Sequence, residues 1–77
     1  MVRLFTTPNC VYCATLKAFL NKQNIEFQEI DVAKDMEARK EMIEKSGQMG
    51  VPVTEIDGQI VVGFDKVKIS ELLDIKE

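Results

Sequence analysis

The apolar residues of this chain switch repeatedly between the two-residue period of a strand and the longer period of a helix. Residues 2–6 are mostly β-branched, aromatic or aliphatic and lead into a Thr-Pro-Asn segment at 7–9, which predicts a strand and a turn. From residue 11 to about residue 22 the apolar side chains recur at helical spacing. The chain therefore begins with a predicted strand, turn and helix.

A second strand and helix follow in the same order. Residues 25–30 alternate apolar and polar side chains, which predicts a strand with one buried face. The next helix is expected to begin between residues 31 and 35, with Met36 and Met42 on its apolar side. Gly47 is a residue type that often ends helices, and we expect this helix to end there.

The last third of the sequence predicts a hairpin and a helix. Residues 51–56 and 59–62 are rich in β-forming residues and flank an Asp-Gly pair at 57–58, a strong signal for a two-residue turn. Asp65 is placed to cap a final helix. The apolar stripe of that helix is expected to contain Val67, Ile69, Leu72, Leu73 and Ile75.

The complete order is βαβαββα. Two strand–helix steps favour a parallel pairing of the first strands through a right-handed crossover, and the hairpin adds antiparallel strands. We therefore predict an α/β fold in which three helices flank a four-stranded mixed sheet. With 77 residues and no linker or repeat, the chain is expected to form a single domain over residues 1–77.

Composition excludes several classes of function. The chain has no histidine, so cysteine–histidine catalytic pairs and histidine metal sites are excluded. A net charge of −3 and a pI near 4.9, without a basic cluster, argue against binding to nucleic acid. Its apolar runs are too short to span a bilayer, and we expect a soluble cytoplasmic protein that binds no membrane.

The pair of cysteines in Cys10-Val11-Tyr12-Cys13 can carry redox chemistry. Cys10 falls at the predicted start of a helix, where unpaired N–H groups and the helix dipole favour a thiolate. Cys13 lies one turn later, where it can attack a mixed disulfide formed at Cys10. Without histidine, this activation depends chiefly on the helix N-terminus, and Lys17 is the nearest candidate cation in sequence.

Three other interpretations of the pair remain open. A structural disulfide is disfavoured because the expected compartment is reducing and the closed loop is very short. A zinc site would need two further ligands, so we expect no metal. An inert core position suits Cys13 better than Cys10, which follows Pro8 and Asn9.

The segment before the third predicted strand contains Val51-Pro52, for which the sequence allows two interpretations. The proline can simply open an edge strand. Alternatively, a cis peptide bond there leaves the backbone groups of Val51 free to pair with an extended substrate.

Together with Gly63-Phe64-Asp65 before the last helix, these motifs resemble those of the glutaredoxins over essentially the whole chain. The resemblance implies a thioredoxin fold in which Cys10 attacks, Cys13 resolves the mixed disulfide and Pro52 is a cis proline. It also implies glutathione as reductant or co-substrate, with no other bound cofactor. The residues that the resemblance assigns to glutathione or a substrate peptide are Tyr12, Arg39, Val51, Pro52, Gly63, Phe64 and Asp65.

Some of these positions have structural interpretations too. Arg39 is equally compatible with a solvated helix face, and Phe64 with a core or interface aromatic residue. Tyr12, Met49 and Phe64 are also candidates for an apolar rim around Cys10.

The chain departs from the family pattern at three positions: Val11 replaces a proline, Thr7 a common lysine, and Gly50 a threonine. These changes are similar to those in glutaredoxin-like redoxins that take electrons from thioredoxin reductase and serve ribonucleotide reductase. Two further alternatives are a glutathione-dependent iron–sulfur cluster shared between two subunits and a non-catalytic adaptor. The expected partners are glutathione or thioredoxin reductase and disulfide-containing proteins, and we expect a monomer.

Overall fold

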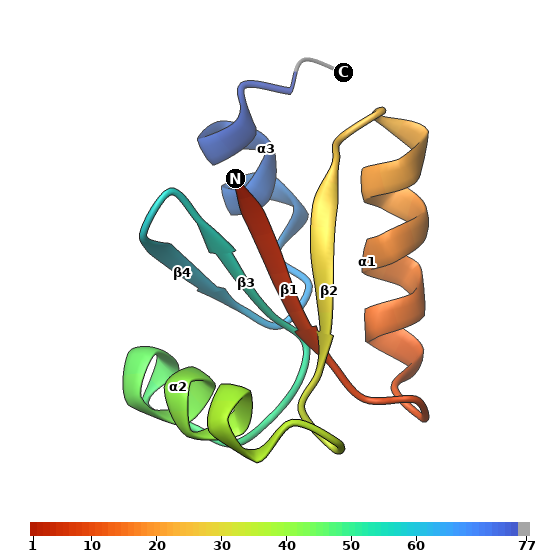
Figure 1. Cartoon of the computed structure of the whole chain (residues 1–77). Coiled ribbons are helices and arrows are strands. Elements are labelled where there is room, and N and C mark those ends of the chain that lie inside the picture. Colours follow the sequence, from red (N-terminus) through yellow and green to blue (C-terminus); the bar gives the residue numbers. More distant parts are fainter. Residues whose placement is uncertain (76–77) are drawn as a thin grey trace.

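The computed structural model describes residues 1–75 and has the predicted order βαβαββα (Figure 1). Its strands are β1 (Val2–Thr6), β2 (Phe27–Asp31), β3 (Val53–Ile56) and β4 (Gln59–Val62), and its helices are α1 (Val11–Lys22), α2 (Met36–Ser46) and α3 (Lys66–Leu73). The sheet order is β2-β1-β3-β4, with β1 parallel to β2 and antiparallel to β3, and β3 antiparallel to β4. This confirms the four-stranded mixed sheet. None of the helices within residues 1–75 has the length and apolar character needed to cross a membrane.

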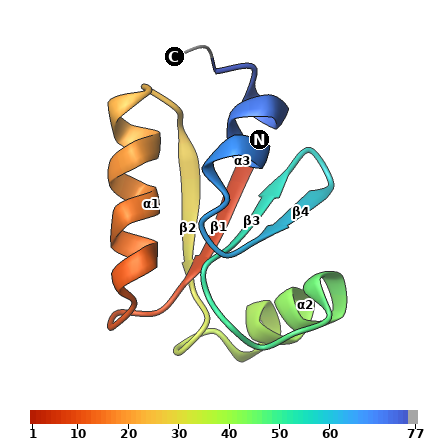
Figure 2. The same cartoon turned by 180° about the vertical axis from the view of Figure 1, so that it is seen from behind.

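The central strand β1 sends alternate side chains to two separate cores, one on each face of the sheet (Figures 1 and 2). Leu4 packs with Leu16 of α1 and Ile69 of α3 on one face. Phe5 packs with Met42 of α2 on the other. Each of these side chains is fully buried. The sheet is therefore covered on both sides, by α1 and α3 on one face and by α2 on the other.

The ends of the helices are defined by local side-chain and backbone geometry. The Oδ1 atoms of Asp35 and Asp65 accept the backbone N–H groups of Ala38 and Lys68 at 3.0 and 3.1 Å, capping α2 and α3. Gly47 ends α2 in the left-handed region with φ of 73°. These observations confirm the predicted cap at Asp65 and the predicted end of α2.

Two strands begin later than the alternation predicts. The N–H of Ile25 donates to the carbonyl of Leu20 at 2.9 Å, so this residue completes the end of α1 and β2 begins only at Phe27. Strand β3 begins at Val53, directly after a proline that has no N–H to contribute to the sheet. Both differences arise from backbone hydrogen bonding, which side-chain alternation does not report.

Two residues predicted to lie on apolar helix faces are exposed instead. Val67 is 70% exposed and Met36 is 56% exposed. Val67 lies two positions from the buried Ile69, about 200° around the helix, and so cannot share its face. Ile75 of the predicted stripe lies beyond the end of α3, where its N–H donates to the carbonyl of Ser70 at 2.9 Å.

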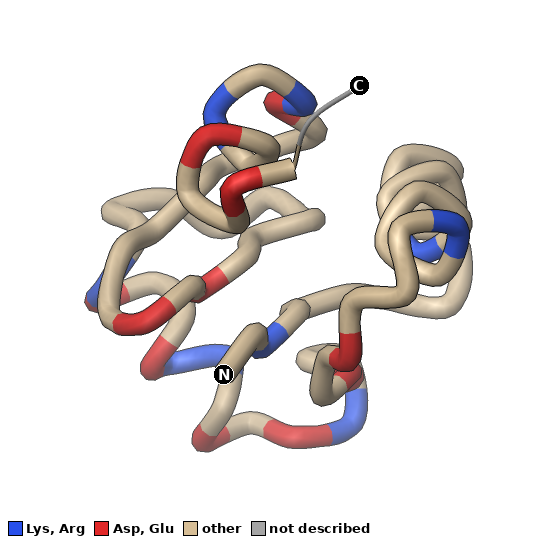
Figure 3. Tube along the Cα trace, turned by 90° about the horizontal axis from the view of Figure 1, so that it is seen from above, with Lys and Arg blue, Asp and Glu red and all other residues tan. Residues whose placement is uncertain are grey.

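A network of four charged side chains joins α2 to the sheet. Arg3 of β1 donates to Glu41 at 2.8 Å through both terminal nitrogens and to Glu55 of β3 at 2.6 Å. Lys45 of α2 contacts the same two carboxylates at 2.8 and 2.6 Å. Hydrogen bonds from Arg3 and Lys45 lower the pKa of Glu41 to about 2, and Lys45 followed by Arg3 also lowers the pKa of Glu55. Figure 3 shows that acidic and basic segments are interspersed over the chain.

Thr54 offers a direct test of packing on the sheet face that α1 and α3 cover, opposite the charged network. Its side chain is fully buried, and its Oγ1 has no hydrogen-bond partner among residues 1–75. We expect Thr54→Val to raise the free energy of unfolding by about 1 kcal/mol, because the substitution removes an unpaired buried hydroxyl and keeps the side-chain shape. Urea unfolding monitored by circular dichroism measures the change.

Thr6→Val is the matched control for this substitution. Thr6 is also buried, but its hydroxyl donates to Glu29 at 3.0 Å, so its removal should give no gain in stability. A loss of stability in Thr54→Val would contradict the expectation.

Candidate active site

The strand register brings the cysteine pair, the Val51-Pro52 segment and the Gly63-Phe64-Asp65 segment to one end of the sheet. Phe5 pairs with Val53, and Val53 pairs with Val62, so the end of β1, the start of β3 and the end of β4 are neighbours. The loop that carries Cys10 follows β1, and the Val51-Pro52 segment leads into β3. Gly63 follows β4 directly. The N–H of Gly63 donates to the carbonyl of Pro52 at 2.9 Å, which links the last two segments directly.

Cys10 is the N-cap residue of α1. Its backbone is extended, with φ of −99° and ψ of 112°, and its Sγ accepts the N–H of Cys13 at 3.1 Å. An N–H group directed at this sulfur, together with the positive end of the helix dipole, stabilises a thiolate there. The structure thus places Cys10 at the helix start, as predicted.

Cys13 occupies a different environment one turn later. It is joined to Cys10 by a disulfide, with the two Cα atoms 5.2 Å apart. Cys10 is half-buried, whereas Cys13 is 1% exposed and is part of the buried interior. Of the two positions, only Cys10 is accessible to a large disulfide substrate.

The peptide bond between Val51 and Pro52 is cis. Strand β3, which Pro52 precedes, pairs with β1 on one side and β4 on the other. The interpretation of Pro52 as an edge-strand opener is therefore wrong. Within residues 1–75 the backbone N–H and C=O of the half-buried Val51 form no hydrogen bond.

The other residues assigned by resemblance lie in varied surroundings. Tyr12 and Met49 are 66% and 61% exposed, whereas Phe64 packs against Phe19, with 6.0 Å between ring centroids, and contacts the core beneath α1 and α3. This packing supports the interpretation of Phe64 as a core aromatic residue. Because Phe64 is half-buried, it can contribute only part of its ring to an apolar rim around Cys10. Arg39 is half-buried on α2, and its guanidinium has no ion pair or hydrogen bond in the described part of the chain. Asp65 uses its carboxylate to cap α3.

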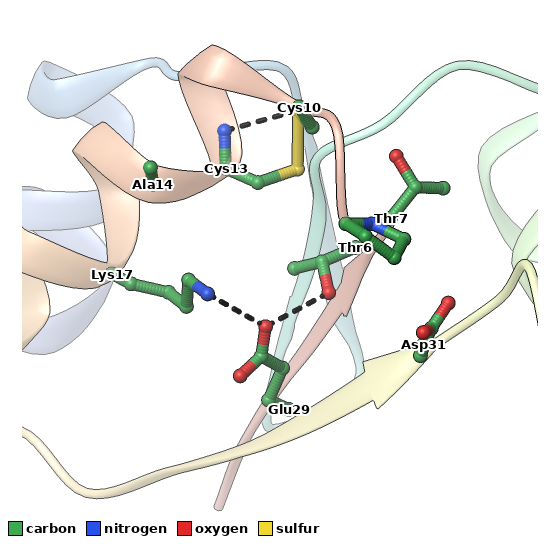
Figure 4. Close-up of a pocket in the computed structure, with 9 residues that line it drawn as sticks. Thr6, Thr7, Cys10, Cys13, Ala14, Lys17, Glu29 and Asp31 are labelled. Atoms are coloured by element: carbon green, nitrogen blue, oxygen red, sulfur yellow. Dashed lines mark hydrogen bonds and ion pairs between the residues drawn. A yellow bond between two sulfur atoms is a disulfide. The ribbon is translucent and has the colours of Figure 1, made fainter.

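A polar cavity of about 340 Å³ lies beside the two cysteines (Figure 4). Its lining is formed by Thr6, Thr7, Pro8, Cys10, Cys13, Ala14, Lys17, Glu29 and Asp31. The ammonium of Lys17 contacts the carboxylate of Glu29 at 2.9 Å. Lys17 therefore reaches the surroundings of the cysteines, as its position in the sequence suggests, but as half of an ion pair.

Glu29 and Asp31 were not identified as site residues from the sequence, although a signal for Glu29 is present. In the predicted strand at 25–30, Glu29 has the same parity as Ile25 and Phe27, which are apolar. A carboxylate on the face that alternation assigns to the core requires a partner. In the structure the side chain of Glu29 stays 42% exposed at the edge of that face, and its partner is Lys17.

Comparison with known proteins agrees with this geometry. A family model described as Glutaredoxin matches residues 2–61. An uncharacterized glutaredoxin-like 8.6 kDa protein in a rubredoxin operon of Clostridium pasteurianum is 45% identical over 74 residues, which are 96% of this chain and 99% of that protein. Glutaredoxin 3 of Escherichia coli K12 is 38% identical over 64 residues, covering 83% of this chain and 77% of the relative. The crystal structure of a thioredoxin-like protein superposes with a TM-score of 0.87 at 33% identity, covering 94% of this chain and 99% of the other.

Proposed function

Because this chain belongs to the glutaredoxin family and joins Cys10 to Cys13, it is a thiol–disulfide oxidoreductase, and we propose that it reduces protein disulfides and glutathione mixed disulfides. The observation that carries the proposal is the contrast between the two sulfurs. One is a half-buried helix N-cap, and the other is fully buried one turn behind it. This arrangement suits a nucleophile followed by a resolving thiol.

In the first step the thiolate of Cys10 attacks one sulfur of a substrate disulfide. A bond forms between Cys10 and that sulfur, the substrate disulfide breaks, and the second substrate sulfur leaves as a thiolate. The N–H of Cys13, at 3.1 Å from the Cys10 sulfur, stabilises the attacking thiolate before the reaction.

In the second step Cys13 loses its proton and attacks the sulfur of Cys10. The Cys10–Cys13 disulfide forms, the mixed disulfide breaks, and the remaining substrate sulfur departs and takes up a proton. Two electrons from an external thiol or a reductase then restore both cysteines.

We assign the binding of glutathione or a substrate peptide to the surface around Cys10. The backbone of Val51, which forms no hydrogen bond within residues 1–75, is available to pair with an extended peptide. The guanidinium of Arg39, which has no ion pair or hydrogen bond to any residue that the structure describes, is available to a carboxylate. Tyr12, Pro52, Gly63, Phe64 and Asp65 complete the proposed set.

Trapping the mixed disulfide tests this mechanism. Cys13→Ser removes the resolving thiol, so the reduced variant should accumulate one glutathione on Cys10 after exposure to glutathione disulfide. Intact-protein mass spectrometry counts the adduct. Ala14→Ser, a change at the exposed neighbouring residue, should not accumulate it. The mechanism is contradicted if Cys13→Ser carries no adduct, or if the adduct lies on another residue.

Thioredoxin reductase is the second candidate electron donor. Thr7 stands where the family commonly has a lysine, which removes one cation from the neighbourhood of the cysteines. Steady-state turnover with glutathione and glutathione reductase, compared with turnover with thioredoxin reductase, distinguishes the donors. Thr7→Lys should increase the glutathione-dependent rate and leave the other unchanged, if the missing cation is what limits glutathione binding.

A further inference from the structure

The two cysteines face different electrostatic surroundings. Both cysteines border the 340 Å³ cavity, which also has charged side chains from two elements, but Cys10 caps the helix and receives an N–H, whereas Cys13 is buried one turn later. Helix α1 contributes Lys17, and β2 contributes Glu29 and Asp31. Strand β1 and the following loop contribute only the uncharged Thr6, Thr7 and Pro8. One ammonium and two carboxylates therefore line the cavity into which the buried Cys13 faces.

Helix geometry and strand register bring Lys17 and Glu29 to this cavity. Lys17 is four residues after Cys13 on α1, so their side chains lie on the same helix face. Glu29 pairs with Leu4 of β1 and so lies on the sheet face that α1 covers. Figure 4 shows the two side chains extending toward each other below the cysteines.

Glu29 holds two hydrogen bonds at one oxygen. Its Oε2 accepts from Lys17 Nζ at 2.9 Å and from the hydroxyl of the buried Thr6 at 3.0 Å. The hydrogen bond from Lys17, followed by that from Thr6, lowers the pKa of Glu29, so its carboxylate is charged at neutral pH. The negative charge of Glu29 is thus held in a defined position at the lining of the cavity.

We infer that Lys17 is the cation that stabilises the thiolate of Cys13 in the resolving step, and that Glu29 limits this effect by pairing with Lys17. The inference rests on the proposed function. In that step Cys13 gives up its proton to water in the cavity, and the departing substrate thiolate takes up a proton, so no further reactant is required. Lys17 and Glu29 act as positioning residues, because neither bonds to sulfur.

The inference predicts opposite effects for two neutralising substitutions. An ammonium near a thiol favours the thiolate, and a carboxylate disfavours it. Lys17→Gln leaves Glu29 and Asp31 as the charged groups of the cavity and should slow the resolving step about tenfold at neutral pH. Glu29→Gln releases Lys17 and should accelerate the step by a similar factor.

The test is a single-turnover experiment on the reduced full chain with glutathione disulfide between pH 5 and pH 9. Rapid acid quenching and mass spectrometry follow formation and decay of the glutathione adduct on Cys10. We expect the pH midpoint of adduct decay to rise by about one pH unit in Lys17→Gln and to fall by about one in Glu29→Gln. Lys17→Arg keeps the charge and should retain the original midpoint.

Two substitutions outside the cavity are matched controls. Lys22→Gln changes an exposed cation in the last turn of α1, and Glu26→Gln changes an exposed acid before β2. Both should leave adduct decay unchanged. The inference is overturned if Lys17→Gln and Glu29→Gln shift the midpoint in the same direction, or if neither shifts it. Failure of the proposed function is distinguishable, because no adduct would then form even in Cys13→Ser.

Discussion

Replacing Cys10 with serine is expected to lower the rate of disulfide reduction by at least about a thousandfold, equivalent to about 4 kcal/mol in activation free energy. Attack on a disulfide requires a thiolate, and the hydroxyl of serine neither ionises near neutral pH nor substitutes for sulfur as a nucleophile. The rate is measured as NADPH consumption in a coupled assay with the glutathione or thioredoxin reductase system that supports the natural protein.

The local structure makes this substitution well controlled. Cys10 is the N-cap of α1, and serine is a preferred N-cap residue, so the helix should keep its start. The unfolding midpoint of Cys10→Ser should therefore match that of the natural protein in its reduced form. Cys13→Ser, which removes the other sulfur, should still form a mixed disulfide. Retention of more than a tenth of the rate in Cys10→Ser would show that the nucleophile lies elsewhere.

Arg3→Met is expected to lower the free energy of unfolding by about 2 kcal/mol. The guanidinium of Arg3 contacts Glu41 and Glu55, and the side chain of Glu55 is only 10% exposed. Methionine keeps the apolar stem but, among residues 1–75, leaves only Lys45 as a cation in contact with the two carboxylates. Urea unfolding at pH 7 measures the loss. Arg39→Met is the matched control on α2 and should change stability by less than about 0.5 kcal/mol.

The same network of Arg3, Glu41, Lys45 and Glu55 predicts how the free energy of unfolding changes at low pH. The folded-state pKa of Glu41 is about 2 and that of Glu55 is lowered, against an ordinary value of 4.5. The native protein therefore binds fewer protons than the unfolded chain, so this contribution is complete above pH 4.5 and is lost as the pH falls toward 2.

In Arg3→Met both pKa values return toward 4.5, so stability should fall less steeply over this interval. Glu29, whose pKa is also lowered, keeps its partners in both proteins and cancels in the comparison. Equal slopes in the two proteins would contradict the role assigned to Arg3.

Features of the fold that depend on neighbouring residues were predictable from the sequence. The bounds of β1 and α1, the cap at Asp65 and the hairpin turn at Asp57 and Gly58, with φ of 48° and 87°, all follow from short patterns. The position of Cys10 at a helix start is of this kind, because a strand, a turn and an amphipathic helix are each readable within a few residues.

Features that depend on register were not predictable in the same way. Arg3 meets Glu55 because β1 and β3 pair in one alignment rather than another, and Lys17 meets Glu29 because α1 packs over the face of the sheet on which Glu29 lies. Periodicity identifies which face a residue occupies, but it does not identify the residue opposite. The packing of Phe64 against Phe19 likewise depends on how α1 and the β4–α3 loop meet in space.

In the proposed mechanism, the burial of Cys13 also determines the reaction order of each step in disulfide reduction. Because Cys13 is buried and Cys10 is only half-buried, a substrate disulfide reacts directly with Cys10 alone. This step is bimolecular, and its rate rises with substrate concentration. The closure that follows is unimolecular, and its rate is independent of how much substrate is present. When re-reduction by the external reductant is fast, the proposed cycle therefore saturates at high substrate concentration at the rate of an intramolecular closure within the first turn of α1.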